Sequence, residues 1–436
     1  MSTFTGQTGL LVLSVGGSRA PLAHSIRSRK PRRVVFVVSE CSQDNAGSRS
    51  MVEGKDGEPG LIDLPDCPGD TSVLEVPADN LDVALARIDA MLSEEISAGF
   101  RPVIDYTGGT KSMTAAIVLA AAAHAETRLQ FMAGQRSDLT RVKDGTETPV
   151  EMPKDMLGIG QAFETARDMV ARNQYGPARD VITMLERRSP IATLSCIPRG
   201  WRLRVDDWQA WLEVFACWDR FEHAAAWAAL KSALDVGATW AEALEADGWA
   251  GRLEALVAAG QQPDPLLVED LWLNAERRAV NGLFDDAIAR LYRIGEAGAQ
   301  ARLLHLHNVD ATCCPVSELV AMFGENVLKN MKLRRFTREG TDLVSLTGEQ
   351  ARALLLRLNP DDTLALAWRE ESGRRNPRWQ QLRNRSILAH GFRPLTEDDW
   401  LKARKWFDAL RGPLWEDLLG RTTAAQLPDR LPEIAP

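Results

Sequence analysis

The stretch Val103-Ile104-Asp105-Tyr106-Thr107-Gly108-Gly109-Thr110-Lys111-Ser112-Met113 decides the fold of the N-terminal part of the chain. It opens on apolar residues typical of a buried strand, and a run from Thr114 to Ala125 with strong helix propensity follows it. Between the two elements stand two glycines, hydroxyl side chains and one lysine. Glycines let backbone N–H groups approach a ligand, and a helix N-terminus favours negative charge. The stretch therefore predicts a strand, a tight turn and a helix that bind a phosphate or nucleotide. A turn that merely connects the two elements is the alternative.

Two common phosphate-binding motifs do not describe this turn. A P-loop needs glycine directly before its lysine, and Thr110 occupies that place before Lys111. The dinucleotide fingerprint Gly-x-Gly-x-x-Gly is also absent after the first predicted strand, residues 9–15.

Length and composition indicate an ordinary globular protein. A chain of 436 residues predicts two or three domains. Its net charge of −8 gives no global signature of duplex DNA binding, although clustered basic residues could still bind nucleic acid. The six cysteines lack zinc-binding spacing. We found no pattern of a signal peptide or membrane span, and therefore expect a cytoplasmic protein with reduced thiols and no metal site.

Strands and helices alternate in residues 1–152, which predicts an α/β domain with a mostly parallel sheet and helices on both faces. The expected strands are 9–15, 33–39, 73–76, 102–106 and 128–133, with helices at 21–28, 80–99 and 114–125 and a hairpin of 139–143 with 147–151. Residues 44–70 read as an irregular loop. Ligands of such sheets bind at the carboxyl ends of the strands. We expect the following residues to bind a ligand there: Gly16, Gly17, Ser18, Ser39, Thr107, Gly108, Gly109, Thr110 and Lys111.

Helical patterns occupy the rest of the chain. Residues 153–265 predict a helical connector that is rich in tryptophan, and residues 266–436 predict an α-helical bundle. Aromatic residues at helical spacing indicate a core, with a stacking platform for single-stranded nucleic acid as the alternative. The last two helices are expected at 379–390 and 396–418, the latter capped by Thr396.

The stretch Leu382-Arg383-Asn384-Arg385-Ser386-Ile387-Leu388-Ala389-His390-Gly391 carries candidate chemistry. In an unbroken helix, Arg383 and His390 would point the same way and converge on one phosphate, whereas Arg385 would lie off that face. A capping histidine beside a solvated arginine-rich face is the alternative.

These motifs together resemble a known family. The segments 14–18, with Pro21, and 105–113 are similar to the CARF domain of CRISPR-associated proteins. An arginine followed by asparagine, with histidine after four to six residues, is the signature of HEPN ribonucleases. Helices at 274–278 and 285–292 are similar to the HEPN domains found beside CARF sensors. The resemblance implies a Rossmann-like CARF sensor at 1–152, a connector at 153–265 and a HEPN domain at 266–436.

The resemblance also implies an activity. Cyclic oligoadenylate would bind across a homodimer, contacting Thr110 and Lys111 with Gly16–Ser18 nearby, and act as an allosteric activator, with four adenylates favoured. The HEPN domain would cleave single-stranded RNA in type III CRISPR antiviral defence, with Arg383, Asn384 and His390 as catalytic residues and Arg385 as a second fit to the motif.

His390 would act as general acid or base, and an arginine would stabilise the phosphorane. The RNA 2′-hydroxyl is the nucleophile, so the expected reaction needs no metal or other cofactor and leaves a 2′,3′-cyclic phosphate. The alternatives are a non-catalytic nucleotide-sensing regulator with a helical interaction module, and a HEPN toxin-type ribonuclease outside CRISPR.

Overall fold

The computed structural model divides the chain into two compact units, which we describe separately. One unit is Met1–Glu164 with Thr183–Arg202, and the other is Thr165–Ile182 with Leu203–Pro436. The structure describes residues 9–41, 47–134, 145–152, 155–188, 199–329, 331–373, 386–388 and 391–432. No helix in these ranges is both long and apolar enough to cross a membrane.

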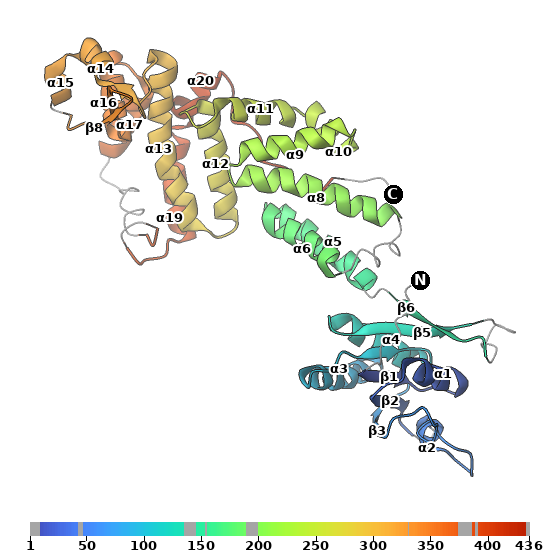
Figure 1. The fold of residues 1–436 in the computed structure, drawn as a ribbon. Coiled ribbons are helices and arrows are strands. Elements are labelled where there is room, and N and C mark those ends of the chain that lie inside the picture. The colour runs from blue at the N-terminus through green and yellow to red at the C-terminus, as the bar shows by residue number, and fades with distance from the viewer. Residues whose placement is uncertain are drawn as a thin grey trace. The chain divides into compact units, whose positions relative to one another are not determined.

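A six-stranded sheet with the order β3-β2-β1-β4-β5-β6 forms the centre of the first unit (Figure 1). Its strands are β1 (Leu10–Ser14), β2 (Arg33–Ser39), β3 (Asp70–Val76), β4 (Val103–Asp105), β5 (Arg128–Ala133) and β6 (Thr148–Met152). All neighbours pair in parallel except β5 and β6, which are antiparallel. The predicted Rossmann-like sheet is confirmed. The strand order reverses between β1 and β4, which is where such sheets bind ligands.

Helices cover both faces of this sheet. They are α1 (Ala20–Arg29), α2 (Arg49–Glu53), α3 (Leu81–Ser97) and α4 (Lys111–Ala123). Side chains alternate along each strand. Leu10 and Val12 accordingly pack with α3 and α4, whereas Leu11 and Leu13 pack with α1 and α2.

Three expectations for this unit need correction. The segment 44–70 is not wholly irregular, since it contains α2, whose Val52 is buried. Strand β3 begins at Asp70, three residues before the predicted start at Val73, because Asp70 already pairs with Arg33 of β2. Helix α4 begins at Lys111 because Thr110 caps it. The predicted strand 139–143 lies outside the described residues.

Helices dominate the rest of the chain. The first two, α5 (Asp155–Ala171) and α6 (Tyr175–Arg188), are divided between the two units, and the next helix begins in the first unit and enters the second at Leu203. The second unit continues with α8 (Arg199–Asp219), α9 (His223–Asp235), α10 (Thr239–Ala246), α11 (Trp249–Ala259), α12 (Pro265–Val280), α13 (Phe284–His307), α14 (Val316–Phe323), α15 (Glu325–Lys329), α16 (Gly348–Leu358), α17 (Thr363–Gly373), α19 (Glu397–Asp408), a π-helical turn η1 (Gly412–Glu416) and α20 (Asp417–Leu419).

The tryptophans of these helices form cores. Trp208, Trp218, Trp272 and Trp415 are among the largest fully buried side chains, and the indole N–H of Trp218 donates to Asp270 over 3.1 Å. The core interpretation is therefore confirmed for these residues, whose rings are not available to stack on nucleic acid.

The C-terminal region differs from the α-helical bundle predicted for residues 266–436, because it also contains strands. A small antiparallel sheet of order β7-β9-β8 joins β7 (Cys314–Pro315), β8 (Arg334–Arg338) and β9 (Thr341–Ser345). Glu339 and Gly340 connect β8 to β9 with φ values of 51° and 78°. Positive φ at both central residues is typical of the tight turn that joins two hairpin strands.

The helix expected at 396–418 is also interrupted. Thr396 caps α19 as predicted, in a reciprocal capping box with Asp399. The regular helix ends at Asp408, and a π-helical turn follows at 412–416. Pro413 lies in that turn, and proline cannot donate the hydrogen bond that a continuing α-helix requires.

Candidate functional site

The loops after β1 and β4 meet at the point where the strand order reverses. A Cβ atom on Gly16 would lie 2.5 Å from the backbone nitrogen of Gly109, and one on Gly108 would lie 2.5 Å from the carbonyl oxygen of Ser14. The Ser14 hydroxyl also donates to the Gly108 carbonyl oxygen over 2.6 Å. Glycine is thus required at both positions because only bare backbone fits. The structure brings together the two glycine turns that the sequence singled out.

The buried Asp105 stabilises the glycine turn that follows β4. Its buried carboxylate accepts hydrogen bonds from the Ser25 hydroxyl over 2.6 Å and from the side-chain amide of Gln130 over 2.8 Å. It also accepts from the backbone N–H and the hydroxyl of Thr107. The same Thr107 hydroxyl accepts from the backbone N–H of Met132 over 2.7 Å. Thr107, predicted as a ligand contact, therefore has its hydroxyl committed to shaping the turn.

Thr110 and Lys111 form the start of α4. The Thr110 hydroxyl accepts from the backbone N–H of Met113 over 3.3 Å and donates to the carbonyl oxygen of Ala78. Lys111 is exposed and has no ion-pair partner among the described residues. The helix N-terminus and this ammonium group together offer an anion both backbone N–H donors and a full positive charge.

The remaining predicted ligand residues differ in accessibility. Gly17 and Ser18 are exposed at the mouth of the first turn. Ser39, at the end of β2, is buried; its backbone N–H donates to the Ser48 hydroxyl over 2.9 Å. Ser39 therefore anchors the start of the following segment instead of presenting a free hydroxyl.

Sequence reasoning missed two residues at this edge. Arg19 directly follows Ser18, and its Nε atom is buried without a hydrogen-bond partner among the described residues. The position of Arg19 directly after the Gly16–Ser18 turn was the sequence signal that could have identified it. Tyr106 follows Asp105, and burial, helped by the nearby Asp105 carboxylate, raises its pKa. Its phenol stays neutral and donates to the sulfur of Met152 over 3.3 Å.

The predicted catalytic residues Arg383, Asn384, Arg385 and His390 lie outside the described residues. The three residues between them that are described, Ser386–Leu388, are not helical. Ser386 forms an isolated β-bridge with Arg393, and its carbonyl oxygen accepts from the backbone N–H of Gly391 over 3.1 Å. The unbroken helix expected at 379–390 is therefore wrong at these residues, and helical spacing no longer supports a shared direction for the arginine and the histidine.

The chain after His390 is fixed to neighbouring helices. The backbone N–H of Leu395 donates to the Asp285 carboxylate at the start of α13 over 2.9 Å, and α19 begins two residues later. Ile387, Leu388 and Phe392 are exposed, Phe392 to 94%. Three exposed apolar side chains thus lie within or directly after the candidate stretch in the sequence.

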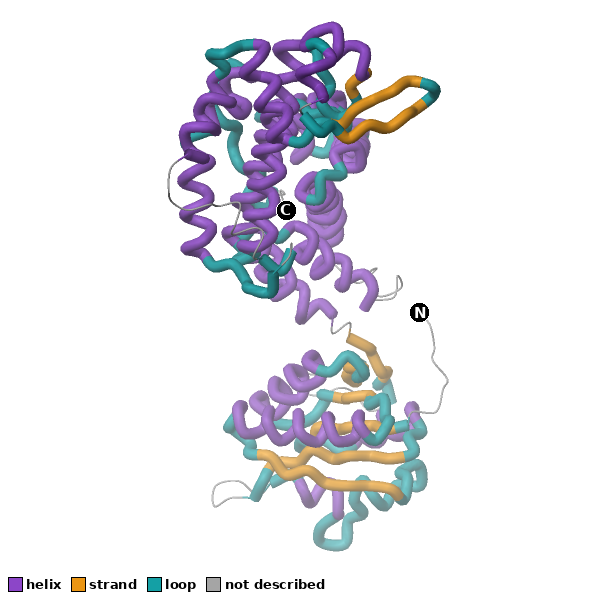
Figure 2. The backbone as a smooth tube through the Cα atoms, turned by 90° about the vertical axis from the view of Figure 1, so that its left-hand side faces the viewer, coloured by secondary structure: helices purple, strands orange, loops and turns teal. Residues whose placement is uncertain are grey.

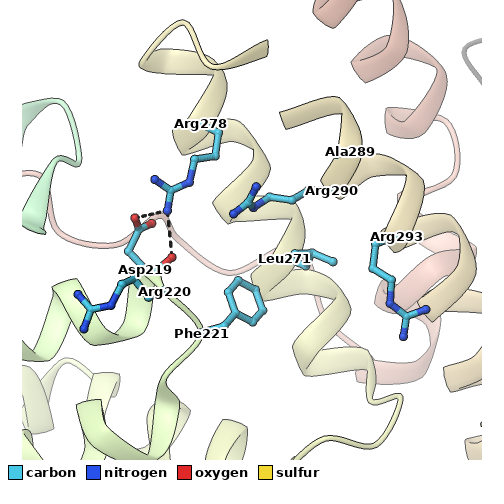
Figure 3. Close-up of a pocket in the computed structure, with 8 residues that line it drawn as sticks. All are labelled: Asp219, Arg220, Phe221, Leu271, Arg278, Ala289, Arg290 and Arg293. Carbon is cyan, nitrogen blue, oxygen red and sulfur yellow. Dashed lines mark hydrogen bonds and ion pairs between the residues drawn. The ribbon is translucent and has the colours of Figure 1, made fainter. Parts of the chain in front are cut away.

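A pocket of about 540 Å³ lies where the end of α8 meets α12 and α13, and Figure 3 shows the residues that line it. Its lining contains four arginines and one acidic residue, namely Arg220, Arg278, Arg290, Arg293 and Asp219, together with Phe221, Leu271 and Ala289. Asp219 accepts from Arg278 over 2.5 Å and from the buried Arg277 over 2.8 Å. Sequence reasoning missed this pocket because it forms where the end of α8 approaches α12 and α13, which lie more than 40 residues later in the chain. Each of the four arginines lies in an ion pair with a carboxylate: Arg220 with Glu222, Arg278 with Asp219, Arg290 with Asp286 and Arg293 with Glu296.

Comparisons with known proteins identify the C-terminal part of the chain. Residues 257–411 match the family model described as the Csm6 HEPN domain. No curated protein matches the sequence significantly. The structure of Enterococcus italicus Csm6 bound to cyclic hexa-2′-fluoro-hexa-dAMP is similar over 95% of this chain and 95% of that chain, with 12% sequence identity and a TM-score of 0.55. Can2 from Sulfobacillus thermosulfidooxidans, in complex with cyclic tetra-adenylate, aligns over 40% of this chain and 49% of that chain, with 13% identity and a TM-score of 0.23.

The first of these structural similarities concerns the fold, and the second is too low to support an argument. A Rossmann-like sheet precedes a mostly helical region in this chain, and the family match lies within that region. Residues 257–411 therefore match the Csm6 HEPN domain, and the chain as a whole has the fold of the Enterococcus italicus Csm6 structure.

Proposed function

We propose that this protein is an endoribonuclease that cleaves single-stranded RNA when cyclic oligoadenylate binds its N-terminal domain, and that it serves antiviral defence in type III CRISPR systems. One observation carries the proposal: the two glycine turns meet beside the α4 N-terminus on the same chain as a HEPN domain of the Csm6 family. An anion-binding turn and an RNase-type domain on one chain suit a ligand-controlled nuclease.

The input site would use backbone and a few side chains. We propose that Gly16, Gly17 and Gly109 let the ligand approach the backbone, and that Thr110 and Lys111 place the helix start and a cation beside a phosphate. We also place Ser18 and Gly108 at this site, with Ser39 and Thr107 acting through the shape of the edge. Cyclic tetra-adenylate remains the favoured ring. Hexa-adenylate belongs beside it in any assay, because a Csm6 of similar fold is bound to a hexameric analogue.

The output site would use the arginine–histidine motif. The RNA 2′-hydroxyl attacks the adjacent phosphorus, the P–O5′ bond breaks, and the products are a 2′,3′-cyclic phosphate and a 5′-hydroxyl. We assign His390 to proton transfer and Arg383, with Asn384, to the phosphorane; Arg385 is the alternative arginine. RNA supplies the nucleophile, so we propose that cleavage needs no metal, and EDTA should leave the rate unchanged.

We further propose a cytoplasmic homodimer. One chain offers one arginine–histidine set, and a twofold axis would pair two sets and give a symmetric pocket for a cyclic ligand. We propose that the chain consists of a sensor domain at 1–152, a helical connector at 153–265 and a HEPN domain at 266–436. Light scattering of the purified protein tests the dimer directly.

The decisive variants separate the two sites. His390→Ala should abolish ligand-stimulated cleavage while ligand binding persists. Lys111→Ala should weaken ligand binding and leave the slow, ligand-free cleavage near the wild-type rate. Cleavage that survives His390→Ala would refute the catalytic assignment. Loss of basal cleavage in Lys111→Ala would argue against a separate sensor. A dimer that binds ligand but never cuts RNA would favour the regulatory alternative.

A further inference from the structure

The β8–β9 hairpin, residues 334–345, is an unusual surface feature of the second unit. Figure 2 shows its two strands extending away from the neighbouring helices. Every residue of β8 is exposed, whereas Leu343 and Val344 of β9 are buried at 6% and 0% exposure. The hairpin is therefore fixed through β9, while β8 faces solvent along its whole length.

Positive charge is concentrated on the exposed strand. Lys332, Arg334, Arg335 and Arg338 lie within seven residues that include no acidic residue. None of the four has an ion-pair partner among the described residues. Elsewhere arginines are commonly paired, as Arg302 is with Asp362 over 3.0 Å. In a chain of net charge −8, such a local excess creates a positive field that attracts polyanions.

The order of side chains along β8 is specific. Residues two apart in a strand point to the same face, so Arg334, Phe336 and Arg338 share one face. The Phe336 side chain is exposed at 38% although it is large and apolar. A base can stack on such a ring while guanidinium groups on either side contact phosphates. A protein partner of acidic character would not need the exposed ring between the cations.

We propose that the β8–β9 hairpin binds single-stranded RNA through Arg334, Phe336 and Arg338, with Arg335 adding charge on the other face. That the bound strand is the substrate of the HEPN domain rests on the proposed ribonuclease function. Binding itself does not, since it depends only on cations and an aromatic ring on the hairpin.

The test measures RNA binding without cleavage. The full-length chain carrying His390→Ala is titrated against a fluorescent single-stranded RNA, and anisotropy gives the Kd between 0.05 and about 1 M salt. The test variant adds R334Q, R335Q and R338Q. The matched control adds R32Q, K55Q and K231Q, which remove three exposed cations elsewhere that have no ion-pair partner among the described residues.

The expected effect follows from counterion release. Each lost phosphate contact lowers the slope of log K against log salt by about 0.7, so three contacts lower it by roughly 2. If the affinities converge near 1 M salt, the test variant should bind about 100-fold more weakly at about 0.1 M. R334K, R335K and R338K together should retain the slope. Phe336→Leu should weaken binding by about tenfold and leave the salt slope unchanged, because it removes stacking but no charge.

Several outcomes would overturn the proposal. The triple glutamine variant and the control could have equal slopes, which would make the hairpin an ordinary solvated face. Alternatively, Phe336→Leu could bind as the parent does, which would show that no base stacks on the Phe336 ring. The proposed nuclease fails separately: RNA binding that depends on the hairpin in a protein that never cuts RNA would leave this proposal standing.

Discussion

Adding one methyl group at Gly16 should damage the first unit, whereas the same change at Gly17 should not. A Cβ at position 16 would lie 2.5 Å from the Gly109 nitrogen and 3.4 Å from the Cα of Gly108, and these are backbone atoms that cannot rotate away. A Cβ at Gly17 would meet nothing within 4 Å. The two neighbours thus receive the same chemical change in opposite surroundings.

The two substitutions should change the free energy of unfolding in different directions. Overpacking of this kind costs about 1–3 kcal/mol, so Gly16→Ala should lower the free energy of unfolding of the first unit by that amount. For a unit of about 180 residues this corresponds to a melting temperature roughly 2–12 °C lower. Gly17→Ala removes chain entropy from the unfolded state without a clash, so it should be neutral or stabilise by up to about 1 kcal/mol.

The assay can follow each unit by itself. All 13 tryptophans lie between Trp201 and Trp415, so tryptophan fluorescence reports chiefly on the second unit. Hydrogen exchange of the β1 and β4 amides reports on the first. Gly16→Ala should speed exchange in β1 and β4 and leave the fluorescence transition in urea unchanged. Exchange equal to wild type in Gly16→Ala, or equally accelerated in Gly17→Ala, would refute the close approach of the two turns.

Two further predictions concern the second unit. Asp219→Ala removes the carboxylate that pairs with Arg278 and with Arg277, which is 2% exposed. Because a buried cation is then left unpaired, the free energy of unfolding should fall by about 3–5 kcal/mol. Urea unfolding followed by tryptophan fluorescence measures this loss. Glu222→Gln, in the exposed pair with Arg220, should change the midpoint little, and equal losses in the two variants would contradict this reasoning. Burial and a hydrogen bond to Glu213 raise the pKa of Cys217 to about 11. Iodoacetamide should therefore label the exposed Cys41 at pH 8, and Cys217 only as the pH approaches 11. The stability that the neutral thiol contributes is present at neutral pH and disappears as the pH rises through that value. Labelling of Cys217 at the rate of Cys41 at pH 8, measured by mass spectrometry, would show that the thiol is not buried.

Sequence alone predicted the elements that have strong local signals. Continuous apolar runs defined β1 and β2, and Thr396 with an acidic first turn identified the start of α19. The glycine turns were identified as a site, and strand order explains why they meet: β1 and β4 are neighbours although about 90 residues separate them.

Other features depend on tertiary contacts or on weak patterns. Strand β8 consists of arginines, one phenylalanine and one threonine, and it lacks the apolar alternation that signals a half-buried strand. The hydrogen bond between Asp105 and Gln130 joins neighbouring strands, and no local pattern predicts it. The arginine pocket of Figure 3 needs the approach of α8 to the α12–α13 pair. Burial of Ser39 and the internal hydrogen bonds of Thr107 likewise follow from packing.

Cleavage of a single-stranded RNA by the purified, full-length protein, with and without cyclic tetra- or hexa-adenylate, tests the proposed switch most directly. The expected result is slow cutting alone, fast cutting with one of the two rings, no response in Lys111→Ala at the same ligand concentration, and no cutting in His390→Ala. Fast cutting that is independent of either ring, or ring-stimulated cutting that persists in His390→Ala, would contradict the assignment of input to the glycine turns and output to the arginine–histidine motif.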